Sequence, residues 1–327
     1  MMTLGFYTAE RRVDASQTIP RPTSETLADP AAYIPPEGLV DAVNVALVLG
    51  QPLLLTGEPG CGKTQLASNL AWSFGLEPLL KFETKSDSTS ESLFYRYDSL
   101  RHFEASSKGE GGDPARYITW NALGLAILGT LPAHERGRYL AGATDLPEPR
   151  KSVVLIDEID KAPRDFPNDV LNELEHLYFR VPEYGNEVIR ADGEHRSIVV
   201  ITSNSERDLP EPFLRRCVFH HISFPDEETV RRIALSHLGS HVRDLDPLLD
   251  EAVAFFSALR ADSAGLSRRP GLAEFLNWLV MLGHRDPAEH RLTARTVRAT
   301  LSVLVKTTID MQRANSVTTS WFAGRGG

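Results

Sequence analysis

The sequence predicts an α/β fold in which helices cover a parallel sheet, followed by a small all-helical domain. Two apolar, β-branched runs at 153–156 and 197–202 have the composition of strands that are buried on both faces. A third apolar run at 52–55 leads through a glycine-rich turn directly into a helical pattern. After Pro225 no strand-like run occurs, and the apolar residues recur only at helical spacing.

Length and composition fit about two globular domains. The chain has 327 residues, of which 42% are hydrophobic and 24% are charged, an ordinary composition for a folded protein. We place a flexible, polar N-terminal arm at 1–32, an α/β domain at 33–224, a helical domain at 225–313 and a flexible tail at 314–327. The two folded domains therefore take up most of the chain.

The charge balance and the cysteines exclude several classes of protein. With 35 Lys and Arg against 44 Asp and Glu, the net charge is −9, which argues against a nucleic-acid surface built by overall charge. Cys61 and Cys217 are the two cysteines, and we expect both to be free thiols in a reducing cytosol. The sequence shows no secretory signal and no apolar stretch long enough to span a membrane. We therefore expect a cytoplasmic protein.

Periodicity and turn residues predict the remaining elements. In the first half we expect a helix at 37–49 ending at Gly50, a helix after the glycine-rich turn, a strand at 79–83, a loop with at most one helical turn at 84–112, a helix at 117–131 and a polar connection at 133–150. In the second half we expect a helix at 163–180, a hairpin or exposed loop at 181–196, a strand at 218–222, and helices at 230–238, 248–259, 272–282 and 292–311.

The glycine-rich turn carries the strongest chemical signal. Residues 56–64 read T-G-E-P-G-C-G-K-T and fit the phosphate-binding pattern G-x-x-x-x-G-K-[ST]. Such a turn aims several backbone N–H groups at one point, where a polyphosphate sits at the positive end of the helix. Lys63 would add charge to the β- and γ-phosphates, and the Thr64 hydroxyl would bind Mg²⁺. The residues that we expect at the nucleotide are Gly57, Glu58, Pro59, Gly60, Cys61, Gly62, Lys63, Thr64 and Gln65.

An acidic pair follows the apolar run at 153–156. Asp157 and Glu158 stand at the carboxyl end of a buried strand, where doubly wound sheets bind their ligands. We expect Asp157 to hold Mg²⁺, directly or through its water, and Glu158 to orient and polarise the attacking water. For Asp160 we prefer a simpler reading, an acidic residue in a first helical turn.

Further polar residues follow the other predicted strands. Asn204 comes just after the run at 197–202 and would sense the γ-phosphate, although an Asx-turn that closes the strand is the alternative reading. Arg215 and Arg216 come about a dozen residues later. Paired arginines are often a solvated surface feature, but a guanidinium also stabilises charge on a transferring phosphoryl group. An arginine in the segment 265–270 would point back at the nucleotide.

Taken in order, these motifs resemble those of the AAA+ ATPases and, within them, the MoxR-like group. The resemblance covers 35–311 and rests on G-E-P-G-C-G-K-T, V-V-L-I-D-E-I-D-K-A, I-V-V-I-T-S-N and L-P-E-P-F-L-R-R-C. It implies a five-stranded parallel sheet flanked by helices, a helical lid, and ATP with Mg²⁺ bound between them. Such proteins typically assemble as ring hexamers.

The resemblance also implies roles for the arginines. Arg216 matches the arginine finger that reaches into the neighbouring subunit's site, with Arg215 as the alternative because R-R-C stands where the group often has D-R-F. Arg269 matches the second sensor arginine, with Arg268 beside it because S-R-R-P replaces the more usual S-P-R. The assignments therefore stay open between two neighbouring arginines in each place.

The function implied by the resemblance is ATP-driven remodelling of a protein client, often with a partner that carries a von Willebrand factor A domain. An insert near the ring pore would correspond to 181–196, although we read Tyr184 there as an ordinary hairpin aromatic. An alternative is a nucleotide-gated assembly scaffold that hydrolyses ATP slowly or only with a partner. A motor on DNA is disfavoured by the charge of −9.

Overall fold

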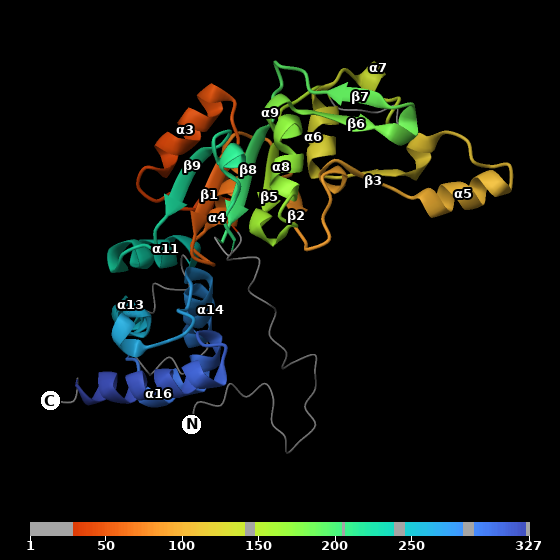
Figure 1. Cartoon of the computed structure of the whole chain (residues 1–327). Coiled ribbons are helices and arrows are strands. Elements are labelled where there is room, and N and C mark those ends of the chain that lie inside the picture. Colours follow the sequence, from red (N-terminus) through yellow and green to blue (C-terminus); the bar gives the residue numbers. More distant parts are fainter. Residues whose placement is uncertain (1–28, 141–147, 205–206, 239–245, 284–290, 325–327) are drawn as a thin grey trace. The chain divides into compact units, whose positions relative to one another are not determined.

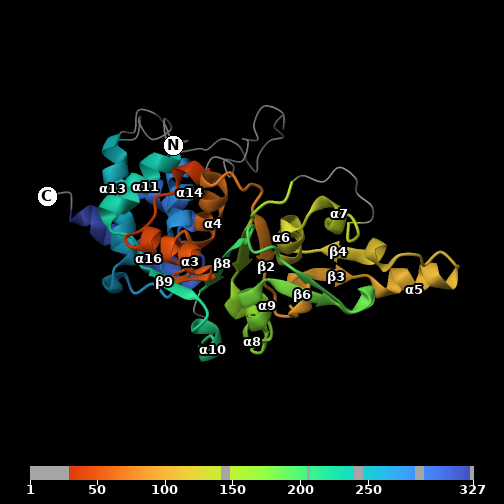
Figure 2. The same cartoon turned by 90° about the horizontal axis from the view of Figure 1, so that it is seen from above.

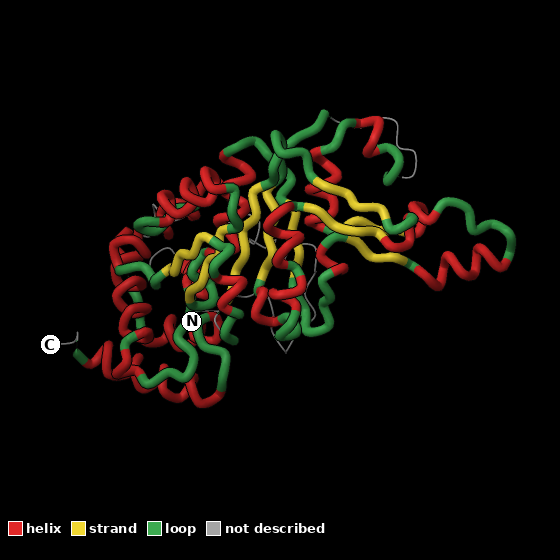
Figure 3. The backbone as a smooth tube through the Cα atoms, turned by 45° about the horizontal axis from the view of Figure 1, so that its top comes forward, coloured by secondary structure: helices red, strands yellow, loops and turns green. Residues whose placement is uncertain are grey.

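The computed structural model describes residues 29–140, 148–204, 207–238, 246–283 and 291–324 (Figure 1). The described residues form two compact units. One contains 35–57 and 63–222, and the other contains the described parts of 1–34, 58–62 and 223–327. All strands of the described residues lie in the first unit (Figure 3). No helix in the described ranges is long and apolar enough to cross a membrane.

A five-stranded sheet forms the centre of the first unit. Its strands are β1 (Leu53–Gly57), β2 (Leu80–Glu83), β5 (Val153–Asp157), β8 (Ile198–Ser203) and β9 (Val218–Ile222). They lie in the order β2-β5-β8-β1-β9, and every neighbouring pair is parallel. The predicted five-stranded parallel sheet is therefore confirmed.

The central strands of the sheet are buried because they are apolar up to their carboxyl ends. All residues of β1 are buried, and Val153 to Ile156 of β5 are completely inaccessible to solvent. Helix α3 (Leu39–Leu49) contacts β9, α4 (Lys63–Ser73) contacts β1, β5 and β8, and α6 (Ala122–Thr130) contacts β2 and β5. Helices cover parallel strands in this way because the crossover connections place them on the faces of the sheet.

The register of the sheet aligns the carboxyl ends of the strands. Glu83 of β2 lies beside Asp157 of β5, and Thr56 of β1 lies between Ser203 of β8 and His221 of β9. Residues that follow these strands therefore emerge at one edge, as expected for a sheet that binds ligand there.

The segment between β2 and β5 differs from the prediction. The expected loop at 84–112 contains β3 (Tyr95–Tyr97) and α5 (Ser99–Ser107), and the expected helix at 117–131 begins with β4 (Ile118–Trp120). β3 and β4 form an antiparallel pair in which the rings of Tyr95 and Trp120 lie 5.8 Å apart. Aromatic cross-strand pairs stabilise a hairpin whose strands are too short to show periodicity. Figure 2 shows α5 extending away from the sheet beyond this pair.

The predicted helix at 163–180 ends earlier than expected. It consists of α8 (Phe166–Asp169) and α9 (Leu171–His176), and it ends at Leu177, whose φ of +45° is left-handed. The chain then enters β6 (Tyr178–Val181), which pairs with β7 (Glu187–Arg190). The hairpin that the sequence predicts at 181–196 is therefore present, but it begins earlier.

Short helices complete the described connections. These are α7 (Ala133–Arg136), α10 (Glu211–Leu214) and the 3₁₀ helices Pro30–Ala32, Glu91–Leu93, Pro114–Tyr117, Ile159–Lys161, Pro182–Tyr184, Asp262–Ala264 and Leu301–Val303. Residues 1–28 of the N-terminal arm predicted at 1–32 lie outside the described residues. The last part of the predicted arm contains the 3₁₀ helix Pro30–Ala32.

The second unit has a helical core of its own. Its longer helices are α11 (Glu227–Leu238), α13 (Asp246–Arg260), α14 (Leu272–Gly283), α15 (Ala294–Thr300) and α16 (Thr308–Ala323). Trp278 is completely buried, and its indole N–H donates to the Thr300 hydroxyl at 2.7 Å. The predicted single helix at 292–311 is broken between α15 and α16, where Thr307 caps the new helix. The expected frayed tail is instead helical through Ala323.

Candidate nucleotide-binding and hydrolysis site

The phosphate-loop motif lies between β1 and α4, as its sequence requires. Gly57, Gly60 and Gly62 have φ values of +149°, +78° and +97°, which only glycine adopts without strain. Lys63 is the first residue of α4, and its Nζ donates to the Gly57 carbonyl at 2.8 Å. The lysine side chain therefore turns back toward the end of β1.

Asp157 receives three donors at the end of β5. Its Oδ1 accepts from Thr64 Oγ1 at 3.0 Å and from Thr202 Oγ1 at 2.7 Å, and its Oδ2 lies 3.0 Å from Lys81 Nζ. Burial on its own raises the pKa of Asp157, but the three donors, the Thr202 hydroxyl foremost, hold the pKa below its ordinary value. Asp157 is therefore held as a carboxylate in one orientation.

Glu158 directly follows β5 in a left-handed conformation, with φ 56° and ψ 53°. Its N–H donates to Thr202 Oγ1 at 2.8 Å. One carboxylate oxygen accepts from Asn204 Nδ2 at 2.9 Å, and the other pairs with Lys161. The two residues predicted to handle the water and the γ-phosphate are therefore in contact.

The predicted role of Asp160 needs an addition. It lies in the first turn of the 3₁₀ helix Ile159–Lys161, in keeping with the reading as a helix start. Its side chain is buried, however, and its two oxygens lie 3.3 and 3.2 Å from the Asn204 N–H. Asp160 therefore anchors the backbone of Asn204, a contact that the local pattern does not show.

The donor set fits a magnesium ion. Mg²⁺ prefers oxygen ligands and is usually held by one or two protein groups together with the phosphates. The Thr64 hydroxyl and the Asp157 carboxylate are already within hydrogen-bond distance of each other. These two residues would therefore hold the ion.

Three residues of this site were not predicted from the sequence, namely Lys81, Lys161 and Thr202. Lys81 comes from β2 and lies 2.8 Å from Glu83 as well as 3.0 Å from Asp157. The available signals were the charged Lys81 between the apolar Leu80 and Phe82, and the polar Thr202 near the end of another strand. Neither signal says which partner the side chain meets.

The predicted finger arginines, Arg215 and Arg216, lie just before β9. They are therefore at the amino ends of the parallel strands, whereas Asp157 lies at the carboxyl ends. Arg216 pairs with Glu175 at 2.8 Å and donates to the Pro212 carbonyl, and Arg215 pairs with Glu211. Arg216 lines a cavity of about 960 Å³ together with Pro52 and Ser197, which precede β1 and β8. The structure therefore does not bring either arginine to the Asp157 site of its own chain.

The predicted sensor arginines lie in the helical unit. Arg269 pairs with Asp262, and Arg268 lies 3.8 Å from Glu274. Arg260 of α13, which the sequence did not single out, forms an ion pair with Glu58 at 2.6 Å within the same unit. Neither Arg268 nor Arg269 contacts a phosphate-loop side chain among the described interactions.

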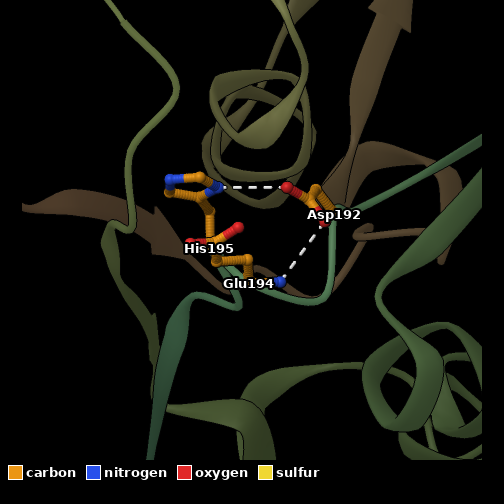
Figure 4. Close-up of side chains that lie close together, drawn as sticks. All are labelled: Asp192, Glu194 and His195. Carbon is orange, nitrogen blue, oxygen red and sulfur yellow. Dashed lines mark hydrogen bonds and ion pairs between the residues drawn. The ribbon is translucent and has the colours of Figure 1, made fainter.

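A second group of charged side chains lies after the β6–β7 hairpin (Figure 4). The ligand atoms of Asp192, Glu194 and His195 lie within 4.8 Å of one another. His195 Nδ1 is 3.1 Å from Asp192 Oδ2, and this hydrogen bond leads in lowering the pKa of Asp192. The Glu194 N–H also donates to Asp192, so the group forms an ordinary turn on the surface.

Comparison with known proteins identifies the family of this chain. The family model described as AAA domain (dynein-related subfamily) matches residues 52–217. Two solved structures of mutant RuvB from Thermotoga maritima are similar, each with 16% identity and a TM-score of 0.46. The matches cover 84% and 85% of this chain, and 69% and 72% of the two RuvB chains. No curated protein matches the chain. Because the family model covers half of the chain, this protein belongs to the AAA domain family, dynein-related subfamily.

Proposed function

We propose that this protein binds ATP together with Mg²⁺ and hydrolyses the ATP. The observation that carries the proposal is a continuous set of hydrogen bonds from Thr64 through Asp157 and Thr202 to Glu158. Asn204 extends the set by its bond to the Glu158 carboxylate. Hydroxyl, carboxylate and amide groups beside a phosphate loop are the groups that phosphoryl transfer to water requires.

Each residue would act on a different part of the reaction. Lys63 and the backbone N–H groups of the loop would bind the β- and γ-phosphates. Mg²⁺ held by Thr64 and Asp157 would neutralise charge on the transferring phosphoryl group. Glu158 would accept a proton from the attacking water while the Asn204 amide holds the carboxylate in place.

Two substitutions test this assignment. We expect Lys63→Ala to abolish nucleotide binding, and Glu158→Gln to keep binding but to lower turnover by about 10²- to 10⁴-fold, the usual contribution of a general base. Phosphate release measures the turnover, and thermal stabilisation by ATP measures the binding. Glu228→Gln, an exposed glutamate of α11, is the matched control. Turnover near the wild-type rate in both variants would refute the assignment.

Assembly into a ring is part of the proposal. Arg216 lies at the edge of the sheet opposite its own Asp157, and 40% of its side chain is exposed. An arginine placed in this way would serve hydrolysis only in the site of another copy. The resemblance to MoxR-like proteins makes Arg216, or its neighbour Arg215, the candidate for a residue supplied in trans.

Remodelling of a protein client is the function that we infer for the assembly, in line with the MoxR-like motifs. Two features extend from the sheet and would reach a client: the β6–β7 hairpin and the segment that carries α5, where Leu100 and Phe103 are 67% and 72% exposed. A partner with a von Willebrand factor A domain fits the same resemblance. Addition of such a partner is expected to change the ATPase rate.

A nucleotide-gated scaffold is the second candidate. Both carboxylate oxygens of Glu158 are already engaged, one by Asn204 and one by Lys161, which favours slow hydrolysis until these contacts change. Assembly with ATP, but turnover only after a partner is added, would favour the scaffold. The charge of −9 continues to disfavour action on DNA.

A further inference from the structure

We infer that the hydroxyl of Thr202 is a positioning group that orients both members of the acidic pair. This inference rests on the proposed hydrolysis and assigns Thr202 a place in it. Thr202 lies in β8, two residues before Asn204, and is completely buried. Its Oγ1 lies 2.7 Å from Asp157 Oδ1 and 2.8 Å from the Glu158 N–H.

The direction of both hydrogen bonds is fixed by chemistry. A backbone N–H only donates, so Thr202 Oγ1 accepts from Glu158. An ionised carboxylate only accepts, so the single hydroxyl proton goes to Asp157. One hydroxyl therefore links the residue expected at the metal to the residue expected at the water.

Strand register explains why Thr202 is placed there. Ile156 of β5 lies opposite Ile201 of β8, so the next residue on each strand, Asp157 and Thr202, are neighbours at the carboxyl edge. The chain then leaves the sheet at Glu158, whose left-handed conformation is unusual for a residue other than glycine. The Thr202 hydroxyl supplies the partner for the Glu158 N–H at this turn, and it therefore holds the backbone that aims the carboxylate.

The same hydroxyl restricts the rotation of the Asp157 carboxylate. Oδ1 accepts from both Thr202 and Thr64, while Oδ2 faces Lys81. Without the Thr202 bond, Oδ1 would keep the Thr64 hydroxyl as its remaining donor of the two, and the orientation of the carboxylate would be less restricted. Loss of the hydroxyl would therefore affect both the water-activating step and the Mg²⁺ dependence, while Lys63 and the phosphate loop stay intact.

Thr202→Val tests the inference, because valine keeps the shape of threonine and replaces the hydroxyl with a methyl group. We expect kcat to fall by about 10- to 100-fold, the size of a misplacement effect of about 1 Å, with KM for ATP changed by less than about threefold. Thr202→Ser keeps the hydroxyl and is expected to retain most of the activity. Thr318→Val is the matched control, since Thr318 is equally buried and its hydroxyl donates to the Ala314 carbonyl in α16.

Two kinetic results for Thr202→Val would each overturn the inference. One is a kcat of Thr202→Val equal to that of the wild type. The other is an equal loss in Thr202→Val and Thr202→Ser, which would assign the effect to packing. If Thr202→Val does not fold, Thr202→Cys replaces it, because a thiol is a weak hydrogen-bonding group, and equal kcat in Thr202→Cys and Thr202→Ser would then overturn the inference.

A binding measurement separates this inference from the proposed function. The Mg²⁺ concentration that gives half of the thermal stabilisation by ATP is measured in the wild type and in Thr202→Val. We expect the variant to need several-fold more Mg²⁺. If the wild type shows no turnover, the proposed hydrolysis is wrong, and an unchanged Mg²⁺ requirement in the variant overturns the positioning role as well.

Discussion

Hydrogen-bond donors hold three acidic side chains of the described residues in place, namely Asp157, Asp160 and Asp310. Asp157 is oriented by two threonine hydroxyls and Lys81, and Asp160 by the backbone of Asn204. In the helical unit, Asp310 is completely buried and accepts from the N–H groups of Ser267 and Arg268 at 2.8 and 3.2 Å. Buried carboxylates need such donors because their charge is otherwise poorly solvated.

Asp310 predicts a pH dependence of stability. The hydrogen bond from the Ser267 N–H leads in holding the pKa of Asp310 below its ordinary value, against the opposing effect of burial. A carboxyl group whose pKa is lowered by folding stabilises the protein at pH values above its ordinary pKa of about 3.9. This stabilisation is lost as the pH falls through the folded-state pKa. We therefore expect Asp310→Asn to lower Tm by a few degrees at neutral pH, with a difference that shrinks as pH falls below the ordinary value of about 3.9.

Thermal unfolding followed across this pH range checks the prediction. Asp262→Asn is the control, because the Asp262 side chain is 93% exposed and pairs only with Arg269 among the described ion pairs. The same Tm loss for Asp310→Asn at both ends of the pH range would contradict the electrostatic explanation.

In the segment between β2 and β5, helix α6 packs closely against the backbone at Phe94. Helix α6 approaches the backbone of Phe94 at Gly124, where a Cβ added to the glycine would lie 2.0 Å from the Phe94 carbonyl oxygen. A Cβ added to Gly129, in the same helix, would have no such neighbour closer than 4.0 Å. Gly124 therefore has to be a glycine because the Phe94 backbone lies so close, whereas position 129 has room for a side chain.

The two glycines form a matched pair for a stability test. We expect Gly124→Ala to destabilise the protein by about 1–3 kcal/mol, because the backbone of Phe94 must move. Gly129→Ala should be neutral or should stabilise by up to about 1 kcal/mol, since alanine favours a helix more than glycine does. Urea unfolding of both variants measures the difference. Equal stabilities would show that the segment around Phe94 adapts without cost.

At the scale of the whole molecule, the two ends of the parallel strands carry different charged groups. The carboxyl ends form what we call the carboxyl edge of the sheet, and the amino ends form its amino edge. The carboxyl edge carries Asp157 and Glu158, and the amino edge carries Arg216 with its partner Glu175. A chain that has an acidic edge and an arginine edge would complete a hydrolytic site by pairing with another copy. This arrangement supports the proposed ring.

Mixing of two inactive variants tests this sharing of sites. Arg216→Ala lacks the arginine but keeps its phosphate loop, and Lys63→Ala lacks the loop lysine but keeps Arg216. If the arginine acts in trans, a random equal mixture should recover up to about a quarter of the wild-type turnover, because an intact loop meets an intact arginine at about one interface in four. The ATPase rate of the mixture is compared with the rates of the separate variants, and no recovery would argue against a shared site.

The sequence by itself determined the parts of this protein that depend on local order. The glycines and Lys63 of the phosphate loop, the apolar runs of β1, β5 and β8, and the acidic pair after β5 follow from neighbouring residues. Their positions are predictable because a buried parallel strand has a recognisable composition and because its carboxyl end is where a ligand binds.

Only the tertiary structure decided which side chains meet. Thr202 and Asp157 are 45 positions apart, and Asn204 and Glu158 are 46 apart, so strand register and not local pattern brings them together. The short strands β3 and β4 were missed because cross-strand pairing outweighs weak local preference. The break between α15 and α16 was missed for a different reason, since the cap at Thr307 is a local contact with Asp310 that the helical spacing of the apolar residues does not reveal. A motif therefore identifies the acidic pair of this protein, but the neighbouring strand determines how the pair is held.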